Sequence, residues 1–295
     1  MSRPEMAVGA VPVAAARRFP LIHVLLLATT TLTTAMASSL FQGFDPIDDP
    51  RQLVHGVPFA ATLITILLVH ESGHYLMCLR HGVAASMPYF LPAPPNIFPL
   101  GTFGAFIRIR SRFPDRRALF DIGAAGPWGG FVVAVAAMVV GLRLSTVLPA
   151  PPMEHTLELG DSLLTTFLTR SVLGTDPDVV MLHPVAFAGW VGLFITSLNL
   201  LPAGQLDGGH VLYAVAGRRT RLLPAVLLAT LLWLGLHGWA GWLFWAAIIV
   251  FMVSLGHPPS QNDARPLDGP RVLAACATVA VFVLTFVPEP IRILP

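Results

Sequence analysis

The chain has 295 residues, of which 55% are hydrophobic and 12% are charged, and its mean hydropathy is +0.71. A soluble domain carries about 25% charged residues, so this composition excludes an ordinary soluble domain and indicates a polytopic membrane protein. The formal net charge is +2 and the arginines follow the loops, which argues against nucleic-acid binding. The two cysteines both fall in apolar segments, which excludes a disulfide framework and a thiolate zinc site.

The first apolar run begins near Leu21, directly after the basic pair Arg17 and Arg18. The run is longer than the apolar core of a signal peptide, which has about 7–15 residues. We therefore predict a first transmembrane helix over residues 20–41. Cleavage of a signal peptide near "AMASSL" is the alternative.

Further apolar segments follow along the chain. They cover residues 56–79, 122–144, 184–201 with an interrupted extension to 216, 222–237, 239–256 and 271–288. These segments predict an all-α polytopic membrane protein with about six to eight transmembrane helices. We expect one integral membrane domain over residues 1–295. Within it, 20–41 is the first span, 56–216 the core and 222–288 the C-terminal spans.

The arginines predict the orientation of the chain. If the N-terminus is cytoplasmic, fourteen of the 18 arginines lie on the cytoplasmic side, and the remaining four are Arg51, Arg143, Arg170 and Arg292. Cytoplasmic loops of membrane proteins are enriched in arginine, so this distribution favours a cytoplasmic N-terminus. We expect a multi-pass protein of the bacterial inner membrane, with its N-terminus in the cytoplasm.

Two connections between the predicted spans are long. Residues 80–121 are basic and rich in proline, and within them "GTFGAFIRIR" (101–110) alternates in polarity with the period of two that is typical of a strand or hairpin. The preceding "PYFLPAPPNIFPL" is too apolar to lie in water, so we expect this element to be associated with the membrane. Residues 145–183, on the opposite side, are predicted to form a lid or a solvated loop.

The segment "LLVHESGHYL" (67–76) places ionisable residues inside the second predicted span. Such residues are costly in a membrane and are therefore functional candidates. His70 and His74 share one face of a helix, where both rings can reach one metal ion, and Glu71 is adjacent. This is the H-E-x-x-H pattern of zinc hydrolases, in which zinc acidifies a water and the glutamate accepts its proton. The alternative is that the histidines bond to neighbouring helices and Glu71 pairs with an arginine.

A third ligand is expected in "NLLPAGQLDGGHV" (199–211), where Pro202 and Gly204 interrupt the helix. Asp207 is the predicted ligand, since non-helical backbone at membrane depth is tolerated where it lines a wet cavity. Two alternatives stay open: Asp207 caps the resuming helix, or His210 replaces it as ligand. His70 lies about ten residues, or about 15 Å, before the cytoplasmic end of its span, and the arginines place Asp207 in the same leaflet.

These two motifs, together with "GTFGAFIRIRSRFPDRRALFDIGAAGP" and "GHPPSQNDARPLDGPR", resemble the site-2 protease family of intramembrane zinc metalloproteases, in particular its EGY-like subgroup. HExxH and NxxPxxxLDG are both complete and stand in the family's order, and the similarity covers roughly residues 55–272. The resemblance implies that His70, His74 and Asp207 bind one catalytic Zn²⁺ and that Glu71 is the general base. It also implies that Asn199 holds the substrate backbone or polarises its carbonyl, with a helix–helix hydrogen bond as the alternative role.

The function that follows is hydrolysis of peptide bonds within or near transmembrane segments of membrane proteins. The strand at 101–110 is the candidate for binding an unwound substrate as an added strand, and a structural hairpin is the alternative. Gly123, Gly126, Gly129 and Gly130 are predicted to pack against the catalytic helices. The partners expected are transmembrane substrates and the lipid bilayer, and the sequence does not decide between a monomer and a homo-oligomer. A non-catalytic scaffold or chaperone that binds transmembrane helices is the rival function.

Overall fold

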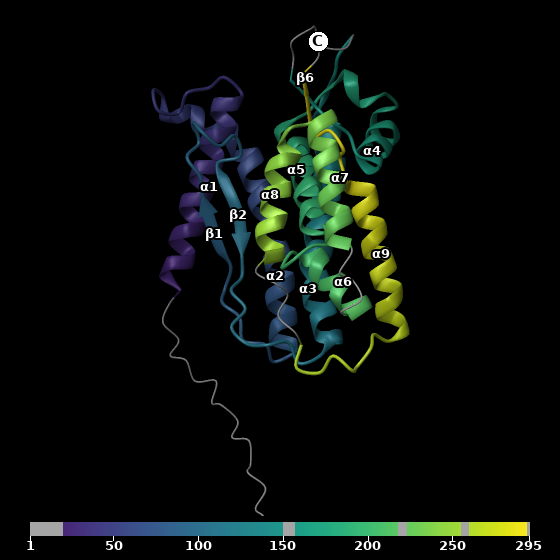
Figure 1. Ribbon diagram of the computed structural model, residues 1–295. Coiled ribbons are helices and arrows are strands. Elements are labelled where there is room, and N and C mark those ends of the chain that lie inside the picture. The colour runs from purple at the N-terminus through teal and green to yellow at the C-terminus, as the bar shows by residue number, and fades with distance from the viewer. Residues whose placement is uncertain (1–19, 150–156, 218–222, 255–259, 294–295) are drawn as a thin grey trace, which may run out of the picture.

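The computed structural model describes residues 20–149, 157–217, 223–254 and 260–293. In this part of the chain, long helices run side by side, with a small hairpin beside the first of them (Figure 1). The helices are α1 (Leu21–Phe41), α2 (Val57–Arg80), α3 (Arg116–Leu144), α4 (Leu163–Leu173), α5 (Pro184–Asn199), α6 (Asp207–Ala216), α7 (Leu223–His237), α8 (Gly241–Ser254) and α9 (Gly269–Thr285), with 3₁₀ turns η1 (Pro50–Gly56) and η2 (Pro177–Val179). The strands are β1 (Tyr89–Pro92), β2 (Thr102–Phe106), β3 (Thr146–Val147), β4 (Leu157–Leu159), β5 (Val180–Met181) and β6 (Ile291–Ile293).

Each predicted span contains a helix, and the interruption after α5 lies where Pro202 and Gly204 stand. Within the described residues, three helical segments are long and apolar enough to cross a membrane: Leu21–Phe41, Pro50–Arg80 and Arg116–Leu144. The later apolar helices have 10–17 residues. At 1.5 Å per residue even the longest of these is about 26 Å, shorter than a hydrocarbon core of about 30 Å. The chain is therefore a mostly helical membrane protein, while six to eight spans stay a prediction, as does the description of residues 1–295 as one domain.

Helix α3 lies at the centre of the bundle, between α2 and α5, and glycines bring the three helices together. A Cβ on Gly73 of α2 would lie 2.5 Å from the Ala125 carbonyl oxygen of α3, and one on Gly189 of α5 would lie 2.7 Å from the Met138 nitrogen. Such contacts are closer than atoms can approach, so only glycine allows these helix distances. Buried side chains of α2, α3 and α5, including Leu63, Leu142 and Trp190, fill the remaining space.

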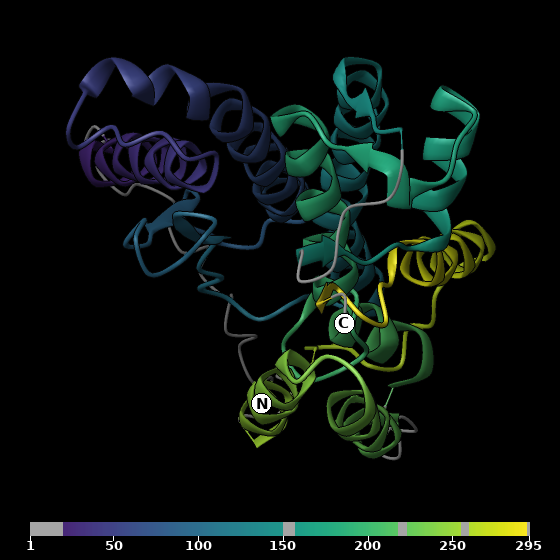
Figure 2. The same ribbon diagram turned by 90° about the horizontal axis from the view of Figure 1, so that it is seen from above.

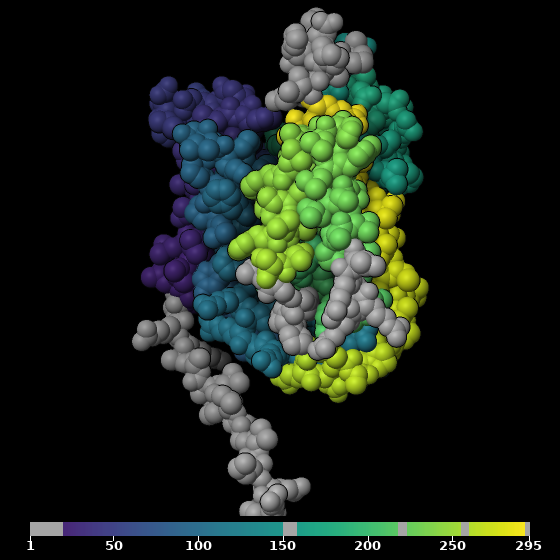
Figure 3. All heavy atoms as spheres, in the orientation of Figure 1, coloured from purple at the N-terminus to yellow at the C-terminus, as the bar shows by residue number. Residues whose placement is uncertain are grey.

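Helices α7 and α8 cover the outer side of α5. Trp242 of α8 and Leu231 of α7 are fully buried in one apolar cluster with Leu198 and Leu201 from the end of α5. In the space-filling view these two helices form the green surface that hides α5 on this face (Figure 3). The opposite sides of α7 and α8 carry exposed large side chains such as Trp233 and Phe244, which suits contact with lipid.

The predicted hairpin is present but shorter than the alternating sequence. Strands β1 and β2 pair antiparallel, with a register irregularity between Leu91 and Pro92. The alternation groups Phe103, Ala105, Ile107 and Ile109 on one face, but Gly104 has a φ of 93°, which breaks the alternation, and Phe103 is exposed. Residues Ile107 and Ile109, beyond the strand, pack inward as the pattern predicts.

The hairpin is attached to α1. The Thr33 hydroxyl of α1 donates a 2.7 Å hydrogen bond to the Gly101 carbonyl. Gly101 has a φ of 65°, and a Cβ there would overlap the backbone of Thr33. Viewed from above, α1 and the hairpin form a group to one side of the other helices (Figure 2).

The segment 145–183 is ordered in its described part, and the prediction of a plain solvated loop was wrong. It contains α4, whose N-terminus has a reciprocal capping box between Ser162 and Thr165 and whose C-cap is the left-handed Gly174. Strand β3 pairs with β5, and β4 pairs with β6 near the C-terminus. These strands have two or three residues and pair across long separations, so they leave no periodic signal. We call residues 157–183 the outer segment.

The predicted orientation depends in part on arginines that lie outside the described residues. These are Arg3, Arg17, Arg18, Arg218, Arg219 and Arg221.

Candidate metal centre

His70 and His74 lie one turn apart in α2, as their spacing predicts, and both are buried. Their Nε2 atoms are 3.1 Å apart. The alternative of hydrogen bonds to neighbouring helices holds for Nδ1 of His74, which bonds to the Ile122 carbonyl of α3, but at Nε2 the two rings meet each other. Both rings therefore direct Nε2 to one point.

Asp207 reaches the same point from the start of α6. Its Oδ2 lies 3.4 Å from Nε2 of His70 and 3.3 Å from Nε2 of His74. The break after α5 allows this, because Gly208 lies against the Leu200 carbonyl so closely that a Cβ would collide with it. The residue at the N-cap position is Leu206, without a side-chain cap, so Asp207 does not cap the helix. Instead its carboxylate faces the two histidines.

His210 is not part of this cluster. Among the described residues, the group with donor atoms close enough to share one metal ion is His70, His74 and Asp207, whose donors all lie within 4.8 Å of one another. The His210 ring instead packs near the Phe113 ring, at 5.6 Å between centroids. The alternative in which His210 replaces Asp207 therefore finds no support in the geometry.

The three donors fit a tetrahedral zinc ion. Zinc bonds to nitrogen and oxygen are about 2.0–2.1 Å long, so two ligands at the tetrahedral angle are about 3.3–3.4 Å apart. The observed separations are 3.1, 3.3 and 3.4 Å. Two imidazoles and one carboxylate leave a fourth position for water or substrate, which is the donor set of a catalytic rather than a structural zinc site.

Helix α3 supplies the surface on which both rings rest. A Cβ on Gly126 would collide with the His74 ring, and one on Gly130 would lie 3.1 Å from Nδ1 of His70. The prediction that these glycines pack against the catalytic helices is thus confirmed, and the closest contacts involve the metal-site side chains themselves. Gly123 faces α6 in the same way, since its Cβ would lie 2.9 Å from that of His210.

The Ile122 carbonyl of α3 fixes the chemical form of His74. It lies 2.7 Å from Nδ1 of His74. Because a carbonyl oxygen can only accept, Nδ1 must carry the hydrogen, and the lone pair of Nε2 is left to face the metal position. Sequence reasoning did not find this contact, since a backbone carbonyl has no signature in residue type.

Glu71 and Asn199 lie at the rim of this cluster. Glu71 is buried, and the backbone of Ile107, just after β2, lies against its carboxylate. Within the described residues, the charged groups that act on Glu71 are His70, His74 and Asp207, and not the arginine of the alternative. Nδ2 of Asn199 is 3.4 Å from Nε2 of His70, so the amide from the end of α5 adjoins the metal position. This contact joins α5 to α2, so a helix–helix hydrogen bond stays open as the role of Asn199.

Comparison with known proteins agrees with the motifs. The model of peptidase family M50 matches residues 58–235. The chain is 34% identical over 239 residues to "Probable zinc metalloprotease EGY1, chloroplastic" of Oryza sativa subsp. japonica, covering 79% of this chain and 40% of the relative. The Arabidopsis thaliana protein of the same name is also 34% identical, over 79% of this chain and 43% of its own length.

A third relative is "Probable zinc metallopeptidase EGY3, chloroplastic" of Arabidopsis thaliana, 27% identical over 90% of this chain and 48% of its own. The chain thus spans less than half the length of these relatives. No solved structure matches the chain. The family match covers more than half of the residues and includes both histidines, Glu71, Asn199 and Asp207, so this chain belongs to peptidase family M50, the site-2 proteases.

Proposed function

We propose that this chain is an intramembrane zinc metalloprotease that hydrolyses peptide bonds within or near transmembrane segments of other membrane proteins. The observation that carries the proposal is the convergence of His70, His74 and Asp207 at tetrahedral separations, with Glu71 beside them in the middle of α2. Its relatives are named as probable zinc metalloproteases, which agrees with this donor set.

The side chains around the metal position have distinct roles in this proposal. His70, His74 and Asp207 would hold the zinc, which when bound supplies Lewis-acid chemistry by acidifying water and polarising a carbonyl. Glu71 accepts the proton of the attacking water and returns it to the leaving amine, the work of a general base and acid. The Asn199 amide donates to the oxygen of the scissile carbonyl as negative charge develops there.

The hairpin is the proposed binding element for the substrate. A transmembrane helix hides its peptide groups in its own hydrogen bonds, so it must be unwound before it is cut. In the described part of the chain the sheet consists of β1 and β2 alone. Strand β1 lies toward α1, while β2 lies on the side of α2 and α8 (Figure 1). A substrate strand added to β2 would gain backbone hydrogen bonds, and the chain beyond β2 leads directly to Ile107 against Glu71.

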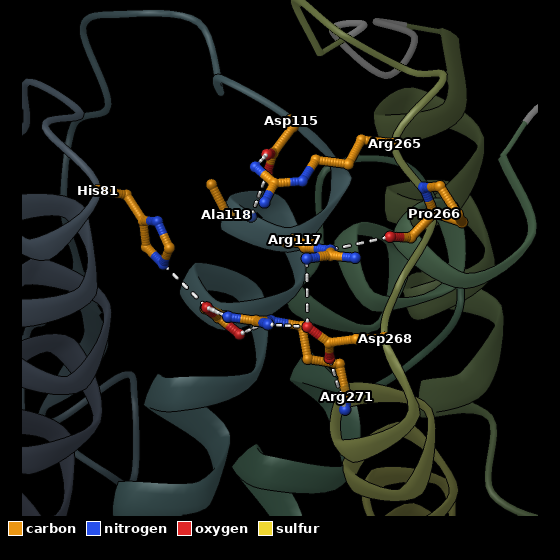
Figure 4. Close-up of polar contacts among 9 residues, drawn as sticks. His81, Asp115, Arg117, Ala118, Arg265, Pro266, Asp268 and Arg271 are labelled. Carbon is orange, nitrogen blue, oxygen red and sulfur yellow. Dashed lines mark hydrogen bonds and ion pairs between the residues drawn. The ribbon is translucent and has the colours of Figure 1, made fainter.

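The proposed setting is a lipid bilayer with the arginine-rich end of the bundle in the cytoplasm. Arg117, Arg265 and Arg271 gather at one end, near the start of α3 and α9 (Figure 4). The opposite end carries the more acidic outer segment. The positive-inside rule then gives a cytoplasmic active-site side, as expected for a protein of the bacterial inner membrane, whereas the named relatives are chloroplastic.

The test uses the purified chain in lipid nanodiscs with single-span peptides that contain helix-destabilising residues. Wild type should cut at least one peptide and hold zinc, whereas Glu71→Gln should hold zinc and lose activity by about 10²–10⁴-fold, because only the proton carrier is removed. Glu158→Gln, the same change in the outer segment, is the matched control and should behave as wild type. Zinc without cleavage of any peptide by wild type would favour the scaffold, and wild type without zinc would overturn the proposal.

A further inference from the structure

A polar cluster lies at the end of the bundle where α2 ends and α3 and α9 begin (Figure 4). At its centre the Asp121 carboxylate accepts hydrogen bonds from Nε2 of His81 at 2.9 Å and from Nε and Nη2 of Arg271 at 2.8 and 2.6 Å. Arg271 also donates to Asp268 through Nη1 at 2.6 Å. We call His81, Asp121 and Arg271 the Asp121 clamp. It joins three helices that are far apart in the sequence.

The peptide unit between Asp121 and Ile122 connects the clamp to the metal centre. Asp121 precedes Ile122, whose carbonyl accepts the hydrogen of His74 Nδ1. His81 is the C-cap residue of α2 and follows His74 by seven residues, about two turns along the helix. Two consecutive residues of α3 are therefore bonded to histidines of α2 and its C-cap. Ile122 accepts from the ring of His74, and Asp121 accepts from the ring of His81. Movement of Asp121 would carry the Ile122 carbonyl with it.

The stretch of α3 that follows needs such external support. Pro127 has no backbone N–H, so the carbonyl four residues earlier, that of Gly123, receives no helical hydrogen bond from it. Gly123 and Gly126 must be glycine to admit α6 and the His74 ring, and glycine lowers the intrinsic stability of a helix by about 1 kcal/mol per residue relative to alanine. The helix is thus weakest directly after the carbonyl that orients His74.

The side chains of the clamp are also largely shielded from water, which strengthens the hydrogen bonds between them. The side chains of Asp121, His81 and Arg271 are only 18, 22 and 29% exposed. Charged hydrogen bonds that are shielded from water are stronger than exposed ion pairs. A carboxylate held by three donors from two other helices has one orientation, and the backbone that carries it is fixed with it.

We propose that Asp121 is a positioning residue for the metal centre: the clamp sets the Ile122 carbonyl against Nδ1 of His74 and thereby aims Nε2 at the metal. This inference rests on the proposed zinc site and adds residues that are not ligands. Side chains that orient a ligand indirectly change metal affinity by about 10–100-fold. Asp121 acts through a peptide unit, so its effect lies at the lower end of that range.

Asp115 offers a matched control within the same region. It caps α3 by accepting from the Ala118 N–H at 2.9 Å and pairs with Arg265 at 2.8 Å. Asp115→Asn thus removes an ion pair between the start of α3 and the segment before α9, and Asp121→Asn removes one between α3 and α9 itself. Asparagine is also a good helix cap. The two substitutions differ in that only Asp121 adjoins Ile122.

The experiment measures the zinc dissociation constant by competition with a chromophoric chelator, together with the visible spectrum after cobalt replaces zinc. Asp121→Asn should weaken zinc binding about tenfold and alter the cobalt spectrum, because the ligand geometry changes. Arg271→Gln should weaken it in the same direction, and the double variant should be no weaker than Asp121→Asn, since both act through one clamp. Asp115→Asn should match wild type.

The outcomes separate this inference from the proposed function. If wild type binds zinc tightly and both Asp121→Asn and Arg271→Gln keep its affinity and cobalt spectrum, the positioning role is refuted while the zinc site stands. An equal loss in Asp115→Asn would also refute it, because the effect would then come from general loosening of α3. If wild type itself binds no zinc, the proposed function fails.

Discussion

A single methyl group on α3 should disable the metal centre. In Gly126→Ala the new Cβ would lie 2.5 Å from Cε1 of His74 and closer still to Nε2 and Cδ2 of the same ring. Non-bonded heavy atoms approach to about 3.5 Å, so the ring must retreat by about 1 Å or more. The obstacle cannot move instead, because α3 is held against α2 by the contact of Gly73 with Ala125.

The displacement is large relative to what a metal site tolerates. Ligand distances in zinc sites vary by about 0.2 Å, so a shift of about 1 Å takes Nε2 out of coordination. A residue that only orients a ligand changes metal affinity by about 10–100-fold. Loss of His74 as a ligand should exceed that, and we expect zinc affinity to fall by more than about 100-fold.

Gly129→Ala is the matched control for this prediction. It lies on the same helix, and its Cβ would lie 3.2 Å from both Cγ1 and the carbonyl oxygen of Val69, contacts that a few tenths of an ångström relieve. Both substitutions gain about 1 kcal/mol of helix propensity, so a difference between them reports the metal site. The assay is zinc content and chelator competition in nanodiscs, with circular dichroism to verify the fold. A folded Gly126→Ala protein that binds zinc as wild type does would refute the packing argument.

Three further predictions concern separate parts of the chain. Asp207→Asn should lower zinc affinity by more than about 100-fold at unchanged helix content, because the carboxylate faces both histidines; unchanged zinc content would count against Asp207 as a ligand. Gly101→Ala should detach the hairpin from α1 and reduce peptide cleavage while zinc is retained. Gly174→Ala is the control, because Gly174 has a similar positive φ but open space around its Cβ, and it should leave cleavage unchanged. Equal cleavage by the two variants would contradict the role of the hairpin. Burial raises the pKa of Asp161 to about 6, above an unfolded value of about 3.9, so its stabilising effect is complete below about pH 4 and is lost as the pH rises through about 6. The Tm of wild type should therefore fall more between about pH 4 and pH 7 than that of Asp161→Asn, and parallel curves would exclude this titration.

The sequence predicts the metal ligands because their signal lies in residue type and spacing. His70 and His74 are one turn apart on a helix, and an aspartate beside Pro202 and Gly204 has broken backbone around it. Their convergence follows from helix geometry and from the order of two motifs. Residue type and spacing along the chain are therefore enough to predict the metal ligands.

The remaining parts of the site depend on contacts between distant backbone atoms. The Ile122 carbonyl and the Ile107 backbone act through groups that every residue carries. The pairing of β4 with β6 joins segments more than a hundred residues apart. The exposed Phe103 follows from the positive φ of Gly104, which alternation alone does not reveal. Such features require the three-dimensional arrangement.

The two ways in which α3 supports His74 lead to different consequences when they fail. Gly126 acts by leaving space, and a methyl group there makes the native ring position inaccessible. Asp121 acts by holding a carbonyl in place, and its loss leaves the native position accessible but less populated. A ligand can restore a minor conformation by mass action but cannot restore an excluded one. Excess zinc should therefore recover cleavage in Asp121→Asn and not in Gly126→Ala. Recovery in both variants would contradict this distinction. It would show that Gly126→Ala makes the native position of the His74 ring less populated and does not exclude it, so that Gly126 affects stability alone.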